Sequence, residues 1–82
     1  MMDRMPVSSS MISSMGFDPE ESMLEVEFNN GKVYQYSGVT ADTYAVLSGA
    51  DSIGKAFSSL IKSQGYTYRQ VWWLAYLHTR RF

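Results

Sequence analysis

The stretch Leu24-Glu-Val-Glu-Phe-Asn-Asn-Gly-Lys-Val-Tyr-Gln-Tyr36 decides the fold, because it has the pattern of a β-hairpin. Its first arm, residues 23–28, alternates apolar and acidic side chains, which is typical of a strand with one buried face. Glu25 and Glu27 occupy the polar positions, and we expect both to be solvated. Residues 29–31, Asn-Asn-Gly, predict the turn that joins this arm to the next.

The length of this turn determines which way the tyrosines of the second arm point. A three-residue loop with Gly31 in the left-handed conformation places Tyr34 and Tyr36 beside Val26 and Leu24. This register collects the apolar side chains on one face, so we prefer it, whereas a slip by one residue would reverse the two faces. Tyr34 and Tyr36 are two positions apart and therefore share a face.

An arm, a strand and a turn precede the hairpin. Residues 1–10 predict an extended N-terminal arm, because Pro6 and a run of serines disfavour helix. Residues 11–17 predict the first strand, with Met11 and Met15 on its apolar face. Residues 18–22 begin with Asp-Pro and predict a turn. The prediction is therefore a three-stranded antiparallel sheet.

Two short helices are predicted after the hairpin. Thr40 suits the N-cap of the first, and Gly49 ends it. Asp51 or Ser52 caps the second, and Gly65 terminates it. The second helix has the clearest amphipathic spacing in the chain, with apolar residues at Ile53, Ala56, Phe57, Leu60 and Ile61.

Residues 70–82 form a Trp-rich tail that predicts a C-terminal apolar helix. Val71-Trp-Trp-Leu-Ala-Tyr-Leu77 has no polar side if it is helical, so it must be covered on every side. A domain this small has little surface with which to cover it. We therefore expect a homo-oligomer or partner interface, and assign to it Val71, Trp72, Trp73, Tyr76 and Leu77.

Composition narrows the class of protein. The 82 residues include no cysteine and one histidine, so we expect no disulfide, no metal site and no cofactor. No apolar run approaches the roughly 20 residues that span a bilayer, and the N-terminus lacks the apolar segment of a signal peptide. We expect a cytoplasmic protein of a bacterial cell or a phage-infected host, without membrane attachment.

Charge is distributed unevenly along the chain. Residues 1–51 carry eight acidic and two basic side chains, whereas residues 52–82 carry five basic ones and no acid. The basic second half could neutralise the first half within the fold, pair with another copy, or bind an anion. The net charge of −1 argues against extensive coating of DNA, because such binding needs many phosphate contacts.

The order and spacing of several short motifs resemble the KTSC domain, a family named for its occurrence at the C-terminus of some lysyl-tRNA synthetases. The matching residues are Val7-Ser-Ser-Ser10, Gly16-Phe-Asp-Pro19, Leu24-Glu-Val-Glu-Phe28, Asn30-Gly31, Val33-Tyr-Gln-Tyr36, Gly38-Val39, Gly54-Lys-Ala-Phe57 and Ile61. The resemblance covers about residues 7–69, and we assign the KTSC-like domain to 11–69. It implies an antiparallel sheet with helices on one face, found as an appendage and as a stand-alone bacterial or phage protein. It suggests RNA binding and supplies no catalytic residues.

Aromatic and basic side chains are interleaved in a way that is typical of sites for bases and phosphates. The tyrosines of the second hairpin arm can instead fill the core, and the preferred register favours that role for them. The tyrosines beside Arg69 lie outside the expected regular elements and are better ligand candidates. The candidate residues of this kind are Tyr34, Tyr36, Lys62, Tyr66, Tyr68 and Arg69.

Residues 49–55 match the G-x-x-x-x-G-K pattern of a phosphate-binding loop, but the context is wrong. Such a loop follows a parallel strand and continues with Ser or Thr, whereas a predicted helix precedes this one and Ala56 follows it. Ser52, Gly54 and Lys55 could still hold an anion at the start of the second helix. An ordinary helix cap with a solvated lysine explains the same residues, and we favour it.

These observations predict a non-catalytic binding module rather than an enzyme. The expected ligand is a nucleotide-like molecule or RNA, and a stand-alone phage protein of this type would act by sequestering a nucleotide signal of its host. The alternative is a protein–protein interaction module that inhibits a host or phage partner through the Trp-rich tail.

Overall fold

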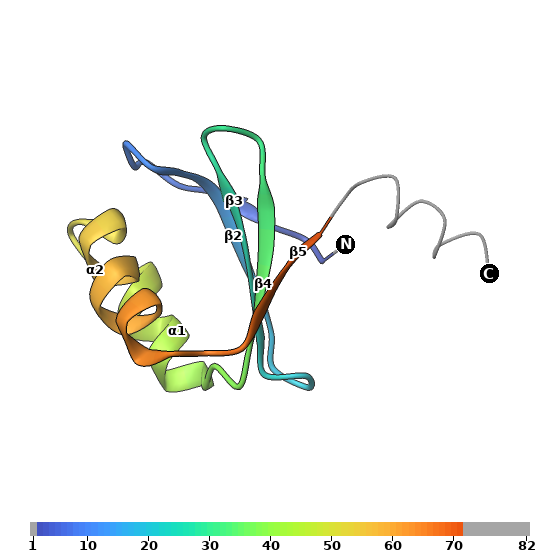
Figure 1. Ribbon diagram of the computed structural model, residues 1–82. Helices are drawn as coiled ribbons and strands as arrows, with labels where there is room; N and C mark the ends of the chain where they lie inside the picture. The colour runs from blue at the N-terminus through green and yellow to red at the C-terminus, as the bar shows by residue number, and fades with distance from the viewer. Residues whose placement is uncertain (1, 72–82) are drawn as a thin grey trace.

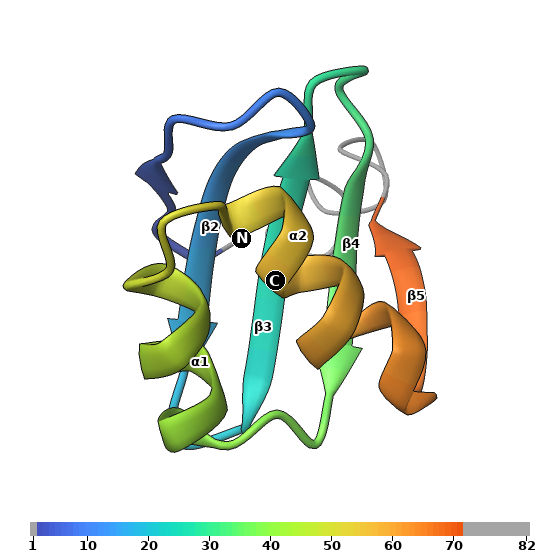
Figure 2. The same ribbon diagram turned by 90° about the vertical axis from the view of Figure 1, so that its left-hand side faces the viewer.

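The computed structural model describes residues 2–71, which form one antiparallel sheet with two helices on one of its faces (Figure 1). The strand order in the sheet follows the chain, β1-β2-β3-β4-β5, and Figure 2 views the layer of helices from the front. The predicted α+β class is confirmed. The elements are β1 (Met5–Pro6), β2 (Ile12–Asp18), β3 (Met23–Phe28), β4 (Val33–Ser37), α1 (Ala41–Ser48), α2 (Ile53–Leu60), the 3₁₀ helix η1 (Lys62–Gln64) and β5 (Tyr68–Val71).

The prediction of a three-stranded sheet is wrong, because β1 and β5 add an edge strand on each side. β1 has two residues and β5 has four, so neither is long enough to show an alternating pattern in the sequence. Pro6 lacks a backbone N–H and is therefore suited to an edge strand. Pairing with β2 and β4 makes strands of segments that have little strand signal of their own.

The predicted C-terminal apolar helix does not match the structure where the two overlap. Gln70 and Val71 were assigned to that helix, but they belong to β5 and pair with Tyr34 and Val33 of β4. A short apolar run does not distinguish a strand from a helix, and the neighbouring β4 decides between them here. The rest of the predicted helix and interface, including Trp72, Trp73, Tyr76 and Leu77, lies outside the described residues.

The β3–β4 hairpin has the predicted register. Tyr34 pairs with Val26, and Tyr36 pairs with Leu24. Gly31 has φ +87°, and its N–H donates to the carbonyl of Phe28 at 2.9 Å. Since a residue with a side chain rarely adopts this conformation, the glycine fixes the loop length and thereby the face on which the tyrosines lie.

The start of β2 differs from the prediction. The register of β2 against β3 shifts between Ile12 and Ser14, so the strand contains an irregularity at this point. As a result Ile12 is fully buried, whereas Met11, which was expected on the apolar face, remains exposed. A bulge of this kind re-aims the side chains on one side of it, and nothing in the alternation of residues 11–17 signals it.

Both helices begin at the predicted caps. The hydroxyl of Thr40 accepts from the N–H of Thr43 at 3.1 Å, and that of Ser52 accepts from the N–H of Lys55 at 3.4 Å. The second helix is shorter than predicted, because it ends at Leu60 and the turn of η1 follows. The left-handed Gly65 then directs the chain back toward the sheet, which positions β5.

The core lies between the helices and the sheet. Phe57 of α2 is fully buried and meets the rings of Phe28 and Tyr36, each at a centroid distance of 5.5 Å. On the other side of the core, Tyr44 of α1 stacks on Phe17 of β2 at 5.0 Å. The buried apolar residues of this core are Ile12, Met15, Leu24, Val26, Tyr36, Val39, Leu47, Phe57 and Ile61.

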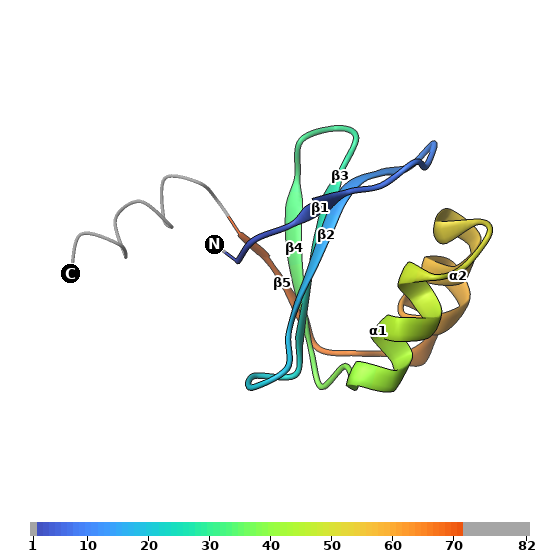
Figure 3. The same ribbon diagram turned by 180° about the vertical axis from the view of Figure 1, so that it is seen from behind.

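The opposite face of the sheet carries a polar network instead of a solvated surface. Residues 2–4 lie on this face, away from the helices, as Figure 3 shows for the N-terminus. The expectation that Glu25 is solvated is wrong, because its side chain is fully buried and pairs with Arg4. The alternation of β3 places Glu25 on the correct face but does not reveal that the N-terminal segment covers it.

A groove of tyrosines between the sheet and the helices

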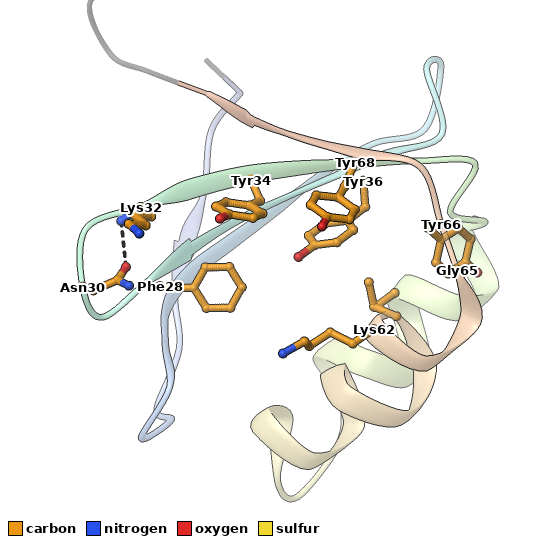
Figure 4. Close-up of a pocket in the computed structure, with 10 residues that line it drawn as sticks. Phe28, Asn30, Lys32, Tyr34, Tyr36, Lys62, Gly65, Tyr66 and Tyr68 are labelled. Atoms are coloured by element: carbon orange, nitrogen blue, oxygen red, sulfur yellow. Dashed lines mark hydrogen bonds between the residues drawn. The ribbon is translucent and has the colours of Figure 1, made fainter.

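A cavity of about 410 Å³ lies between one edge of the sheet and the end of the second helix (Figure 4). Strands β3, β4 and β5 supply one wall, and residues 61–66 supply the other. We call this cavity the aromatic groove, because five of the side chains that line it are aromatic. Its lining residues are Phe28, Asn30, Lys32, Tyr34, Tyr36, Ile61, Lys62, Gly65, Tyr66 and Tyr68.

Three tyrosines from two strands meet in this groove because of the register of the sheet. Tyr36 lies opposite Tyr68, and Tyr34 lies two positions along the same face. Tyr34 and Tyr68 are nearly parallel, with an angle of 13° and 5.7 Å between ring centroids. Tyr36 is 5.5 Å from Tyr68 and 6.4 Å from Tyr34, with angles of 32° and 29°. The three rings therefore present a group of similarly oriented aromatic surfaces.

The three rings differ in exposure. Tyr68 lies on the edge strand with 60% of its surface exposed, whereas Tyr36 is only 6% exposed. Burial, together with the neighbouring Tyr34 and Tyr68, raises the pKa of Tyr36 to about 12. Its phenol is therefore protonated near neutral pH and retains a hydrogen that it can donate. Tyr36 supports the floor of the groove, and Tyr68 offers the accessible ring.

The charged side chains of the groove are all basic. Lys32 comes from the β3–β4 loop, and Lys62 comes from η1 on the opposite wall. None of the described residues that line the groove carries a carboxylate. Figure 4 shows the side chain of Lys62 extending along the groove toward the side on which Phe28 lies. Two ammonium groups beside a wall of rings favour a ligand that is both planar and negatively charged.

The structure brings together five of the nine residues predicted to bind a ligand. These five are Tyr34, Tyr36, Lys62, Tyr66 and Tyr68, and all line the aromatic groove. The other four are elsewhere. Ser52, Gly54 and Lys55 line a separate hollow beside the N-terminal arm. Arg69 lies on the opposite face of the sheet, because it alternates with Tyr68 along β5.

Five lining residues were not predicted: Phe28, Asn30, Lys32, Ile61 and Gly65. A signal for Phe28 was present, since the alternation of β3 places it on the same face as Val26. Asn30 was considered only as a turn residue, and Lys32, on the other side of the loop glycine, was not singled out. The position of Ile61 and Gly65 at the groove depends on where the helix ends, which the amphipathic spacing does not define.

The described residues contain no cluster that suggests a metal ion. Within residues 2–71, no group of three or more His, Cys, Asp or Glu side chains is arranged to hold one. In the same part of the chain, no helix combines the length and apolar character needed to cross a bilayer.

The fold can now be compared with known proteins. The profile of the KTSC domain matches residues 8–69, which is most of the chain. This chain belongs to the KTSC domain family. The crystal structure of a KTSC domain protein from Yersinia pestis is similar, with a TM-score of 0.81 and 38% sequence identity, over 85% of this chain and 97% of that one.

Two relatives have similar sequences. An uncharacterized protein of Stutzerimonas stutzeri is 40% identical over 70 residues, which cover 85% of this chain and 99% of that protein. A protein of Tsukamurella paurometabola is 35% identical over 57 residues, which cover 70% of this chain and 85% of that protein. In these relatives and in the Yersinia structure, the similarity extends over 85% or more of the length of the other protein.

Proposed function

We propose that this KTSC domain is a non-catalytic binding module that holds a nucleotide-like ligand or RNA in the aromatic groove. The observation that carries the proposal is the joint placement of three similarly oriented tyrosines and two lysines in one cavity, with no carboxylate among the described residues that line it. A base would stack on the exposed ring of Tyr68, and a phosphate would lie near Lys62. The cavity volume is within the range of roughly 300–1,000 Å³ that is usual for small-molecule sites.

The types of side chain support binding rather than catalysis. The polar groups of the groove are phenols, ammonium groups and one amide, and none of the described lining residues forms a pair of nucleophile and base. Stacking of a base on an aromatic side chain contributes about 1–3 kcal/mol and tolerates different bases. A protein that binds such a ligand without converting it would act by sequestration, for example of a nucleotide signal in a phage-infected cell.

Calorimetric titration of the full chain tests the proposal. The titrants are nucleoside monophosphates, the matching nucleosides, cyclic dinucleotides, short single-stranded RNAs and inorganic phosphate. We expect the phosphorylated nucleosides or RNAs to bind more tightly than the nucleosides, and inorganic phosphate to bind least. Absence of binding by every base-containing titrant would contradict the proposal.

Paired variants locate the binding. Tyr68→Leu should weaken it roughly tenfold or more, because it removes the accessible ring. Lys62→Gln should weaken binding of the phosphorylated ligands and leave that of the nucleosides unchanged. Lys55→Gln is the matched control, since it removes one exposed lysine from the separate hollow. An equal loss in Lys55→Gln and Lys62→Gln would show that net charge, rather than the groove, is responsible.

A further inference from the structure

We propose that the sheet face opposite the helices carries a recognition site for a guanidinium group, and that Arg4 of the N-terminal segment occupies this site in cis. Arg4 pairs with Glu25 and lies 3.7 Å from a carboxylate oxygen of Glu27. Its Nε donates to the hydroxyl of Ser14 at 2.9 Å. One guanidinium thus meets side chains from both β2 and β3.

The two glutamates that face Arg4 also accept hydrogen bonds from other side chains, which hold them in position. The side-chain amide of Gln35 donates to Glu25 at 2.8 Å, and the hydroxyl of Ser14 donates to Glu27 at 3.1 Å. With the N-terminal segment in place Glu25 is fully buried, so loss of the Arg4 side chain alone leaves this carboxylate with little access to bulk water. A buried carboxylate in a fixed position strongly favours a cation, and the planar fork of a guanidinium suits it better than an ammonium does.

The site also has room for an extended backbone. A Cβ built on Gly16 would overlap the carbonyl oxygen of Asp3, so the N-terminal segment crosses β2 only because residue 16 is a glycine. Two residues farther along, Met5 pairs with Met15 as the first residue of β1. The ligand that fits is therefore an arginine on an extended segment, and residues 2–6 supply one.

The matched part of the family begins after this arginine. The KTSC profile covers residues 8–69, which include Ser14, Glu25, Glu27 and Gln35 but not Arg4. In this chain the acceptors thus belong to the family core, whereas the guanidinium comes from the segment before it. We infer that residues 2–6 act as a strap over a site that does not depend on the strap for its shape. The site is independent of the aromatic groove, which lies on the other face.

Chemical rescue of the full chain tests this inference. Arg4→Ala should lower Tm by more than about 10 °C, since it leaves a buried carboxylate without its cation. Ethylguanidinium at millimolar concentration should restore a saturable part of that loss, and ethylammonium should restore less. Lys55→Ala is the control: it removes an exposed cation from α2, away from the polar face of the sheet, and we expect neither a comparable loss nor rescue.

If Arg4→Ala is folded, either of two outcomes would overturn the inference. One is an unchanged Tm in Arg4→Ala. The other is an effect of ethylguanidinium that is the same in Arg4→Ala and in Lys55→Ala. If Arg4→Ala is unfolded, ethylguanidinium should refold it, which circular dichroism monitors. A variant that stays unfolded in ethylguanidinium would contradict the proposed site. In the double variant R4A/E25Q, which lacks the buried charge, stability should exceed that of Arg4→Ala and the rescue should disappear.

Discussion

Tyr36 connects the core to the aromatic groove, and its ionisation should therefore affect the fold. The ring packs on Phe57 and lies beside Tyr34 and Tyr68, and burial raises its pKa to about 12. An unfolded tyrosine titrates near pH 10. Because the folded state favours the protonated phenol, this stabilisation is fully present below pH 10 and is lost as the pH rises through about 12.

Tyr36→Phe should remove this dependence on pH. The free energy of unfolding of the unmodified protein should fall between pH 10 and pH 12 more steeply than that of the variant. Urea unfolding measured over this range provides both curves, and neutral pH serves as the internal reference. Parallel curves for the two proteins would show that the phenol of Tyr36 titrates as it does in the unfolded chain.

Two glycines should respond to alanine in opposite ways. Gly16→Ala should destabilise the protein by about 1–3 kcal/mol, because the new Cβ would overlap the backbone of Asp3. Gly54→Ala should stabilise it by up to about 1 kcal/mol, because Gly54 lies within α2 and a Cβ there meets Ser9 at an ordinary 3.5 Å. Thermal or urea unfolding of the two variants gives the comparison. A stabilised Gly16→Ala protein would mean that the strap does not need this close approach.

Among the elements, those with a strong local signal were predictable and those formed by pairing were not. The bounds of β3, the caps Thr40 and Ser52, and the hairpin register all agree with the sequence-based expectations. β1 and β5 have too few residues for a periodic pattern, and they become strands only because β2 and β4 offer partners. Because β5 shows no strand pattern of its own, its residues Gln70 and Val71 were expected to begin the C-terminal helix.

Phe57 is the fully buried residue of helix α2, while Ile53, Ala56 and Leu60 pack against the same core and are partly exposed. Phe57 is fully buried and contacts the rings of Phe28 and Tyr36 edge-on, so Phe57→Ala should lower the free energy of unfolding by about 3–5 kcal/mol. The neighbouring Ser58 is exposed, and Ser58→Ala should change stability by less than about 0.5 kcal/mol. Equilibrium urea unfolding measures both. A loss below 1 kcal/mol in Phe57→Ala would show that α2 does not depend on this contact, since even moderate core truncations typically exceed that magnitude.

At the scale of the whole molecule, the sheet predicts how stability is distributed. β3 lies in the centre of the strand order, whereas β1 and β5 are at its edges. Hydrogen exchange followed by NMR should therefore find the slowest backbone amides in β3, whereas the amide of Met5 in β1 should exchange faster; Pro6, the other residue of β1, has no amide hydrogen. Protection of β1 equal to that of β3 would contradict this order and would indicate that the N-terminal segment is covered.

The candidate site was predictable to the extent that it depends on the hairpin. The register places Tyr34 and Tyr36 on the face toward the helices. Lys62 of η1, Tyr66 of the following connection and Tyr68 of β5 complete the set. Arg69 was placed with Tyr68 because its segment was taken as irregular, whereas neighbours on a strand point to opposite faces. The uneven charge of the two halves leaves pairing with another copy as one of three expectations, and light scattering after size exclusion tests it.

The position of the helices within the chain has a consequence for how the groove comes into existence. Each of the first three strand pairings joins consecutive strands through a short connection, but β4 and β5 are separated by residues 38–67. Closing such a long loop slows contact formation, so the local meander should assemble first and the β4–β5 pairing last. The tyrosine of β5 would then reach its neighbours only at the end of folding. A ligand bound in the aromatic groove would therefore stabilise contacts that form after the folding transition state. It should lower the unfolding rate and leave the folding rate unchanged.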